Sequence, residues 1–299
     1  MIDDQPRDRA LKKQQAGVLY LVATPIGNLK DLSFRALETL KGVDRILCED
    51  TRNSRFLMDH YGIDRPLQAF HDHNEALATS KMVELMEGGE SLALISDAGT
   101  PLINDPGFPL VVFARAKGIQ VIPIPGACAL IAALSASGLP AHRFAFEGFP
   151  PRKSAARQKF FESLSKETRT LLFYESSHRL IETLDDLRKT LEVGRRLVIG
   201  REITKRFETF LETTVLEASE RVREDENMQK GELVLVLEGA DPRGQEGEIH
   251  AEAHRILKIL LGELSVKSAA RMAADITGLT RDTLYQEALR LKGADKNGA

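Results

Sequence analysis

The sequence has little of several features that mark particular classes of protein. Its 299 residues include two cysteines and no tryptophan. Cys48 and Cys128 are too few for a disulfide framework and lack the spacing of metal ligands, which predicts a protein of the reducing cytoplasm. No apolar run reaches the roughly 20 residues of a membrane-spanning helix, and residues 1–15 lack the apolar stretch of a signal peptide. We therefore expect a soluble cytoplasmic protein, with no membrane contact and a disordered tail over residues 1–15.

The sequence also lacks an excess of positive charge. Its formal net charge is −3, whereas a protein that binds bare nucleic acid through its overall charge is basic. Any contact with RNA must therefore come from a local group of basic residues. Neither GxxxxGK(S/T) nor GxGxxG occurs in the chain, which argues against a nucleoside triphosphate and against a nicotinamide or flavin dinucleotide as ligand.

One stretch stands out among what the sequence does contain, namely LALISDAGTPLINDPG at residues 92–107. Its first four residues, Leu92–Ile95, form a short apolar run with the length and content of a strand that is buried on both faces. The remainder is dense in glycine, proline, aspartate and asparagine, so neither a strand nor a helix can continue through it. We predict a buried strand followed by a loop of defined shape.

Two further stretches have the same design. The apolar run Val18–Ala23 is followed by TPIGN, and the run Gln120–Ile124 is followed by PGA. If the three strands are parallel, their loops meet at one edge of the sheet and form a single crevice, which is where ligands bind in open α/β sheets. Each loop alone could be an ordinary tight turn. Because three of them converge, we favour a binding site.

The composition of these loops narrows the choice of ligand. No lysine or arginine occurs in residues 24–29 or 96–107, so the crevice offers no cation to a triphosphate. Asp97 and Asp105 suit hydroxyl groups or a cation. S-adenosylmethionine fits this description, because it has a ribose diol, an α-ammonium and a positive sulfonium but no phosphate.

The order of apolar runs predicts an α/β protein with two domains and a helical module. Strand and helix patterns alternate over residues 16–138, which favours a parallel sheet with helices on both faces. The aromatic segment 144–149 reads as a linker into a second α/β domain within residues 139–240, which repeats the alternation. Strands are expected there at residues 169–174, 196–200 and 231–237.

The helical patterns within residues 249–292 predict a separate C-terminal helical module. Its helical patterns at 266–276 and 281–292 flank the turn TGLT, with Thr280 as the N-cap of the last helix. This arrangement is typical of a helix-turn-helix, which can contact nucleic acid. A plain helical hairpin explains the pattern equally well.

Polar residues follow two other expected elements. Glu49 and Asp50 come directly after the expected strand 43–48, which would place them near the rim of the crevice. A role in catalysis and a role of Asp50 as cap of the next helix are equal alternatives. The segment HDHNE at residues 71–75 resembles a metal site, but no third histidine or cysteine follows at a suitable spacing, and Asn74 as a helix cap explains it more simply. We expect no metal.

Nine motifs, in this order, resemble the ribosomal RNA small subunit methyltransferase I family, which has a tetrapyrrole methylase-like fold. They are VATPIGNLKDLSFRALETLKGVD, CEDTR, HDHNE, SDAGTPLINDPG, PIPGA, LSASGLP, YESSHR, REITKRFE and KGELVLVLEG. The likeness covers residues 17–239, and the segment VKSAARMAADITGLTRDTLYQEAL is similar to the C-terminal module of that family.

The resemblance implies a fold, an activity and site residues. The fold would consist of two α/β domains with the methyl-donor site in the cleft between them. The activity would be S-adenosylmethionine-dependent 2′-O-methylation of a decoding-centre cytidine in 16S rRNA of the small ribosomal subunit, by a cytoplasmic homodimer. Carried over position by position, the donor pocket would consist of Pro25, Ile26, Asp97, Ala98, Gly99, Thr100, Ile103, Cys128, Ala129, Glu175 and Ile203.

Three positions depart from the usual pattern of that family. Cys128 and Asn104 stand where a serine is common, and Ser177 stands where a proline is common. The departure at Cys128 puts a hydroxyl contact to the donor in question. None of the three removes a group that methyl transfer obviously needs.

The chemistry of the donor suggests a direct in-line displacement, because the sulfonium is already activated and the protein mainly aligns the reacting atoms. A ribose hydroxyl is a poor nucleophile at neutral pH, and a carboxylate that accepts its proton would accelerate transfer by about 10²–10⁴-fold. Glu49 and Asp50 are the candidates for this base. Candidate contacts to RNA phosphates, unless they form only a solvated surface, are Arg152, Lys153, Arg157, Arg179, Arg201 and Lys205.

Two other functions are compatible with the same pattern. One is methylation of a tetrapyrrole, against which the basic residues near 152–159 and the helical module argue, since a porphyrin needs neither. The other is a non-catalytic RNA-binding or ribosome assembly factor that uses the donor only structurally. The defined shape of the loop at residues 96–107 favours an enzyme over such a factor.

Overall fold

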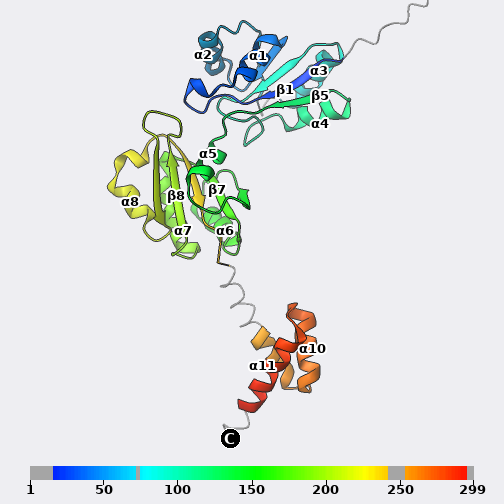
Figure 1. The fold of residues 1–299 in the computed structure, drawn as a ribbon, viewed down its shortest axis with the longest axis vertical. Coiled ribbons are helices and arrows are strands. Elements are labelled where there is room, and N and C mark those ends of the chain that lie inside the picture. The colour runs from blue at the N-terminus through cyan, green and yellow to red at the C-terminus, as the bar shows by residue number, and fades with distance from the viewer. Residues whose placement is uncertain (1–15, 72–74, 242–252, 295–299) are drawn as a thin grey trace, which may run out of the picture.

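The structure is a computed structural model that describes residues 16–71, 75–241 and 253–294. Two five-stranded sheets follow one another along the chain, and a group of helices follows the second sheet (Figure 1). Among these described residues, none of the helices combines the length and the apolar character needed to cross a membrane.

The first sheet is entirely parallel, with the strand order β3-β2-β4-β1-β5. Its strands are β1 (Val18–Val22), β2 (Arg45–Cys48), β3 (Leu67–Ala69), β4 (Leu92–Ile95) and β5 (Gln120–Ile124). The sequence predicts this parallel sheet correctly but leaves out β3, which has three residues at the edge of the sheet. Proline is tolerated at position 123 because β5 is the other edge strand.

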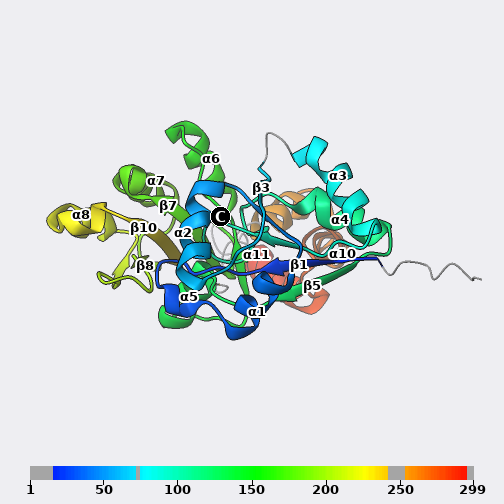
Figure 2. The same ribbon diagram turned by 90° about the horizontal axis from the view of Figure 1, so that it is seen from above.

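Helices cover both faces of this sheet. They are α1 (Phe34–Gly42), α2 (Thr51–Tyr61), α3 (Glu75–Glu87) and α4 (Phe108–Ala116), with the 3-10 turn η1 (Leu29–Asp31) before α1. Side chains of α1 and α2 share one apolar cluster with the sheet, and those of α3 and α4 share the cluster on the opposite face. Figure 2 shows α3 and α4 on one side of β1 and α1 on the other. All four residues of β4 are buried, as the continuous apolar run predicts for a strand covered on both faces.

The second sheet is mixed, with the order β6-β7-β10-β8-β9. Its strands are β6 (Phe144–Phe146), β7 (Thr170–Ser176), β8 (Arg196–Arg201), β9 (Thr209–Thr214) and β10 (Glu232–Leu237). Only β6 and β7 pair in parallel, and the other neighbours are antiparallel. The expected repeat of strand and helix is therefore only partly correct. The loop 202–208 between β8 and β9 is too short for the crossover that parallel strands need, and part of the supposed linker forms β6.

Period-two alternation along β10 assigns its side chains to two cores. Leu233, Leu235 and Leu237 join the cluster under the helices of the second half of the chain. These helices are α6 (Ser154–Ser163), α7 (Leu180–Thr190) and α8 (Ala218–Glu224), with the 3-10 turns η2 (Ser177–Arg179) and η3 (Glu226–Gln229). Val234 and Val236 face the other way, toward a cluster that contains residues from both halves of the chain.

Helix α5 (Ala129–Ala136) joins the two sheets. It follows β5 in the chain, yet Leu130, Ala133 and Leu134 pack in one cluster with β7, β8 and β10 of the second sheet. Figure 1 shows α5 between the two sheets. One apolar face of this helix packs against the second sheet, while Ile131 on another side stays 48% exposed. The helix therefore brings the loop ends of the first sheet close to the second sheet.

The buried Arg157 side chain ties α6 to α7. It is fully buried, and its Nη2 lies 2.8 Å from Oδ2 of Asp186. Its Nε donates to the same carboxylate at 2.9 Å, and Nη1 donates to the Arg152 carbonyl at 3.2 Å. The expectation that Arg157 contacts an RNA phosphate is therefore wrong, because its guanidinium is occupied and out of reach of solvent.

The C-terminal helices form a cluster of their own. They comprise a helix over residues 253–261, α10 (Val266–Thr277) and α11 (Arg281–Ala294). α10 ends at Gly278, which has the left-handed conformation that a helix C-cap favours. Ala269, Ala273 and Leu284 are buried in this cluster. The expected C-terminal helical module with two helices around the turn TGLT is confirmed, and its first expected residues, 249–252, lie outside the described residues.

We predict that Arg157→Ala lowers the free energy of unfolding by about 3 kcal/mol, because it removes the buried cation of Asp186 and leaves that carboxylate with the exposed Lys189 as its ion-pair partner. Urea denaturation followed by circular dichroism measures the change. The matched control is Lys153→Ala on the exposed end of the same helix, which should change stability by less than about 0.5 kcal/mol. Equal effects of the two substitutions would contradict the assigned ion pair.

The stability that Asp186 contributes should depend on pH in one direction. Burial tends to raise the pKa of Asp186, but hydrogen bonds from Gln158, Ser154 and Arg157 outweigh it and lower the pKa. The contribution is therefore complete above the unfolded-state value of about 3.9 and is lost as the pH falls toward the lower folded-state pKa. Asp186→Asn should flatten the pH dependence of unfolding in this acidic range, and an unchanged profile would contradict the assignment.

Candidate functional site

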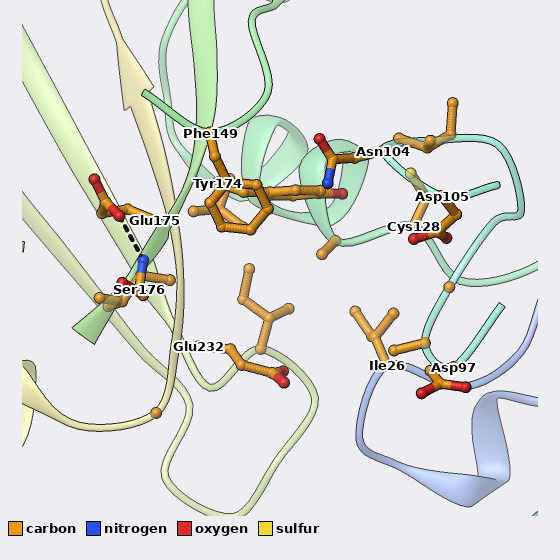
Figure 3. A pocket seen from close by; sticks show the side chains of 18 of the residues that line it. Ile26, Asp97, Asn104, Asp105, Cys128, Phe149, Tyr174, Glu175, Ser176 and Glu232 are labelled. Carbon is orange, nitrogen blue, oxygen red and sulfur yellow. Dashed lines mark hydrogen bonds between the residues drawn. The ribbon is translucent and has the colours of Figure 1, made fainter. Parts of the chain in front are cut away.

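A cavity of about 510 Å³ lies between the carboxyl ends of the first-sheet strands and the second sheet. Figure 3 shows side chains from both sheets facing it, with Asp97, Asp105 and Cys128 on one side and Tyr174 and Glu175 on the other. The residues that line it are Ile26, Asp97, Ala98, Gly99, Thr100, Ile103, Asn104, Asp105, Cys128, Ala129, Phe149, Tyr174, Glu175, Ser176, Ser177, His178, Ile203, Gly231, Glu232, Leu233 and Val234.

Three adjacent strands place their loops at this cavity. β1 lies between β4 and β5, and its last residue, Val22, pairs with both Ile95 and Ile124. The three loops therefore start at the same level of the sheet. Backbone hydrogen bonds join Thr24 and Gly99 in both directions, at 2.9 and 3.1 Å. The predicted convergence of the three loops is correct.

Side-chain hydrogen bonds fasten the same loops. The buried Thr24 hydroxyl donates to the Ser96 carbonyl at 3.1 Å, and the Thr100 hydroxyl donates to the Ala127 carbonyl at 3.0 Å. Thr24 thus ties the first loop to the second, and Thr100 ties the second to the third. Gly99 has a φ of +89°, and a Cβ there would lie 3.2 Å from Cγ2 of Ile26 and 3.5 Å from the Ala127 carbonyl oxygen. The junction of the three loops is tightly packed.

Backbone strain is concentrated beside the cavity. Among the described residues, four other than glycine have positive φ, and all four belong to two loops at its edge. They are Leu102, Asn104, Glu202 and Thr204. Left-handed backbone is unfavourable for residues with a Cβ and persists where the surroundings enforce it, which is common at binding sites. The loops are therefore held in one shape by their contacts.

The second sheet contributes the opposite wall. The buried Glu175 carboxylate accepts hydrogen bonds from the Ser176 amide at 2.7 Å, from Nη2 of Arg179 at 3.0 Å and from the Thr183 hydroxyl at 2.5 Å. Burial raises the pKa of Tyr174 to about 12, so its phenol is neutral at physiological pH. The Tyr174 ring packs against Phe149, with ring centroids 5.7 Å apart. This wall therefore combines aromatic side chains with a carboxylate held by three hydrogen bonds.

The carboxylate residues that line the cavity outnumber its cations, although Arg179 pairs with Glu175 and Lys205 pairs with Glu232 from outside the lining. Four carboxylate residues line it, namely Asp97, Asp105, Glu175 and Glu232, and no lysine or arginine is among its described lining residues. Such a cavity favours a cation and disfavours a phosphate-rich ligand. Apolar walls with a few converging polar groups are typical of a small-molecule site.

The structure brings most of the expected donor-pocket residues together. Ten of the eleven line this cavity: Ile26, Asp97, Ala98, Gly99, Thr100, Ile103, Cys128, Ala129, Glu175 and Ile203. Pro25 lies instead in the wall of a smaller neighbouring cavity. Sequence reasoning did not place Phe149, Tyr174 or Glu232 at the site. Phe149 belongs to the aromatic segment 144–149 that the sequence predicts as a linker, and Tyr174 lies near the end of β7, where the sequence correctly predicts a strand but gives no sign that this side chain faces the cavity.

The two expected catalytic carboxylates do not line the cavity. Asp50 is the N-cap of α2 and accepts a hydrogen bond from the Arg52 amide at 2.8 Å. Its side chain also pairs with the Arg52 guanidinium, and these hydrogen bonds lower the pKa of Asp50 to about 2. Such a carboxylate is a weak base at neutral pH. Glu49 is exposed and absent from the cavity wall, so the geometry favours the capping interpretation.

The expected phosphate contacts fall into three groups: exposed residues, buried residues and residues held in ion pairs. Arg152 and Lys153 are exposed at the start of α6. Arg201 is buried and donates to the Lys230 and Phe207 carbonyls, so the expectation for Arg201, like that for Arg157, is wrong. Arg179 is occupied by Glu175, and Lys205 is partly exposed between Glu202 and Glu232. The partners that occupy Arg201 and Lys205 are distant in the chain and are not evident from the sequence alone.

Metal ligation has no geometric support in the described part of the chain. No group of three or more histidine, cysteine, aspartate or glutamate residues is arranged there to hold an ion. Asp72, His73 and Asn74, which belong to the HDHNE segment, lie outside the described residues. The expected cap at Asn74 therefore stays a prediction.

Two family models together match most of the chain. Residues 18–219 match the Tetrapyrrole (Corrin/Porphyrin) Methylases, and residues 247–292 match the RsmI C-terminal HTH domain. The ribosomal RNA small subunit methyltransferase I of Pseudomonas aeruginosa is 51% identical over 279 residues, which is 93% of this chain and 99% of the relative. The protein of the same name from Escherichia coli O157:H7 is 48% identical over 277 residues, covering 93% of this chain and 96% of the relative.

Solved structures share the fold. The methyltransferase CobJ superposes with a TM-score of 0.56 at 18% identity, over 75% of this chain and 95% of that one. A uroporphyrin-III C-methyl transferase from Thermus thermophilus, in complex with S-adenosylhomocysteine, superposes with a TM-score of 0.52 at 17% identity, over 74% of this chain and 97% of that one. The expected pair of α/β domains of the tetrapyrrole methylase type is confirmed.

The two cysteines should differ in reactivity. Cys48 is fully buried in β2, and burial raises the pKa of its thiol. Cys128 is partly exposed in the wall of the cavity. Because alkylation requires an accessible thiolate, iodoacetamide should label Cys128 in the folded protein and leave Cys48 unmodified, as measured by peptide mass spectrometry. Cys128→Ser is the control that removes the label, and faster labelling of Cys48 would contradict the structure.

Proposed function

Since the chain belongs to the ribosomal RNA small subunit methyltransferase I family, we propose that it methylates the ribose 2′-oxygen of a decoding-centre cytidine in 16S rRNA. The coarser activity, S-adenosylmethionine-dependent methylation of small-subunit rRNA, follows from membership of the family. The choice of a cytidine ribose rests on the resemblance of the sequence motifs. We further propose a cytoplasmic homodimer that acts on the assembled small subunit.

The electrostatics of the cavity are the observation that best supports this function. The methyl donor carries a positive sulfonium and an ammonium and has no phosphate, and the cavity presents Asp97, Asp105 and Glu232 without a lysine or arginine in its described wall. We propose that the donor binds here, with its adenosine against the apolar residues around Ile103 and Tyr174. The three carboxylates then lie where its cations and hydroxyl groups need partners.

The protein's contribution to the reaction is mainly alignment. The ribose oxygen attacks the methyl carbon, the bond from carbon to sulfur breaks, S-adenosylhomocysteine leaves, and the hydroxyl proton passes to a base or to water. The loop junction held by Thr24, Gly99 and Thr100 fixes the donor side of this geometry. Positioning of this kind accounts for a large part of the rate enhancement in bimolecular reactions. In this proposal Asp50 orders the start of α2, and Asp50→Asn, which removes its charge, affects positioning more than proton transfer.

Basic residues outside the cavity are needed to bind the rRNA substrate. We propose that the exposed Arg152 and Lys153 contact rRNA phosphates, together with basic residues of the C-terminal module such as Lys267 and Arg271. Separate basic groups reconcile an anionic cavity with an anionic substrate, because solvent and salt screen charges that lie more than about 10 Å apart. An Arg152→Ala, Lys153→Ala double variant should weaken binding to subunits and reduce its salt dependence.

Methyl transfer from labelled S-adenosylmethionine tests the function directly. Small subunits that lack the modification, free 16S rRNA and a tetrapyrrole precursor serve as parallel substrates. We expect label in the subunit RNA, recovered as 2′-O-methylcytidine after digestion to nucleosides. Label in the tetrapyrrole alone would overturn the proposal in favour of small-molecule methylation. Label in none of them, with intact donor binding, would favour an assembly factor.

Substitution of Gly99 should weaken donor binding selectively. Gly99→Ala places a methyl group among Ile26 and Ala127 at the loop junction, whereas Gly118→Ala has a similar positive φ but no neighbour within 4 Å. Both variants should lose some stability through backbone strain. Only Gly99→Ala should raise the dissociation constant for S-adenosylhomocysteine, by about tenfold or more, in calorimetric titration. Equal affinities of the two variants would contradict a donor site at this junction.

A further inference from the structure

A second, smaller cavity adjoins the proposed donor cavity. It has a volume of about 260 Å³ and shares Ile26, Asp97, Ala98 and Glu232 with the larger one. Its other walls come from the loop after β1, from α2 and from the loop after β8. A molecule in this second cavity would therefore be separated from a molecule in the first only by shared side chains. In a group-transfer enzyme, the acceptor and the donor bind in neighbouring sites of this kind.

The α2 wall of this cavity carries an aromatic residue that the fold does not use. Phe56 is 69% exposed, although its neighbours Leu57 and Met58 are buried in the core beneath α2. An exposed phenylalanine contributes little to stability, because most of its apolar surface remains in contact with water. Because Phe56 lines a cavity, its exposed ring could pack against a ligand with an apolar, planar surface.

The polar groups around Phe56 suit the edges of a nucleoside. Asn53, one turn before Leu57, donates through Nδ2 to Oδ2 of Asp97 at 3.1 Å. On the opposite side, Nζ of Lys205 is held between Glu202 at 2.9 Å and Glu232 at 3.0 Å. The cavity thus combines an aromatic surface with amide, carboxylate and ammonium groups. Proteins recognise single unstacked bases with this combination of a stacking surface and hydrogen-bonding groups at the base edge.

Cationic side chains continue from the cavity along the exposed face of α2. Arg52 lies four residues before Phe56, which places it one turn away on the same face of the helix. Its side chain is 89% exposed, and it pairs with Asp50 at 2.9 Å. Arg55 is exposed as well. An aromatic surface beside a row of basic residues is the arrangement by which proteins hold single-stranded RNA, with bases stacked and the backbone close to cations.

We propose that this second cavity is the subsite for the acceptor nucleoside, and that Phe56 is the surface on which its base stacks. The inference rests on the proposed function, because it assumes an RNA acceptor, and it names a specificity-determining residue for that reaction. A base unstacked from the RNA and held against Phe56 places its ribose toward the wall formed by Asp97 and Glu232. The ribose is then next to the proposed donor cavity. Lys205, whose aliphatic chain packs on Gly27, closes this subsite from the side of the second sheet.

Substitution of Phe56 tests the proposal kinetically. Phe56→Leu keeps the residue apolar and removes the aromatic surface, and we expect the KM for small subunits to rise about tenfold or more, as is usual for the loss of a base-stacking contact. The dissociation constant for S-adenosylhomocysteine should not change, and Phe56→Tyr should restore the KM. The matched control is Phe113→Leu on α4, which removes another exposed phenylalanine, 53% accessible, outside both cavities. An unchanged KM for Phe56→Leu overturns the subsite.

A cross-linking experiment separates failure of the subsite from failure of the proposed activity. The full-length protein with S-adenosylhomocysteine is irradiated together with a short single-stranded RNA that contains 5-iodocytidine. We expect the cross-link in the peptide that carries Phe56, whether or not this RNA is methylated. A cross-link elsewhere, or none, overturns the subsite. If Phe56→Leu instead changes the oligomeric state in light scattering, the ring contacts a second copy of the chain and the proposal is also wrong.

Discussion

The site depends on the pairing between the backbones of Thr24 and Gly99. These two residues follow adjacent parallel strands, and their reciprocal hydrogen bonds form an isolated antiparallel bridge after both strands have ended. Gly99 can pair there because its positive φ turns the chain back toward Thr24. The loop that follows then reaches the third loop through Thr100. Without this pairing, three short strands would end in three independent turns, and the cavity would have no fixed wall on the side of the first sheet.

The second constraint is the double role of α5. An apolar helix after β5 would ordinarily return to the face of its own sheet, as α1 and α2 do. α5 instead covers the face of the second sheet that is formed by Leu172, Val198 and Val234. The two sheets therefore share an apolar cluster, and Ile26 and Ile203 lie at the end of that cluster where the cavity begins. The same packing that stabilises the pair of sheets also determines the distance across the site.

The sequence predicts the parts of this structure that depend on local pattern. The buried run at β4, the glycine and proline residues of its loop and the alternation of the first half indicate a parallel sheet with a crevice at its carboxyl edge. Edge strands are harder to predict, because β6 and β9 are short or half-exposed and lack a continuous apolar run. The short loop between β8 and β9 predicts that these two strands are antiparallel. This prediction can be made only after residues 209–214 are recognised as a strand.

Side-chain roles were least predictable where charge was the only signal. Arg157 and Arg201 look like surface residues in the sequence, but partners distant in the chain bury them and occupy their guanidinium groups. Asp50 directly follows a strand that leads to the crevice, which suggests a place in the site. Its side chain instead caps α2 and accepts a hydrogen bond from the Arg52 amide. Conversely, Phe56 carries no sequence motif of its own, and its exposure beside a cavity is visible only in three dimensions.

A structure of the protein with bound S-adenosylhomocysteine tests the central claim most directly, because the account places the donor at the junction of the three loops. We expect the ligand in the larger cavity, between the loop of Gly99 and Thr100 and the wall of Tyr174, with its amino and hydroxyl groups near carboxylates. The smaller cavity beside Phe56 should remain open for the acceptor. A ligand bound at Phe56, or away from both cavities, would contradict the assignment of donor and acceptor.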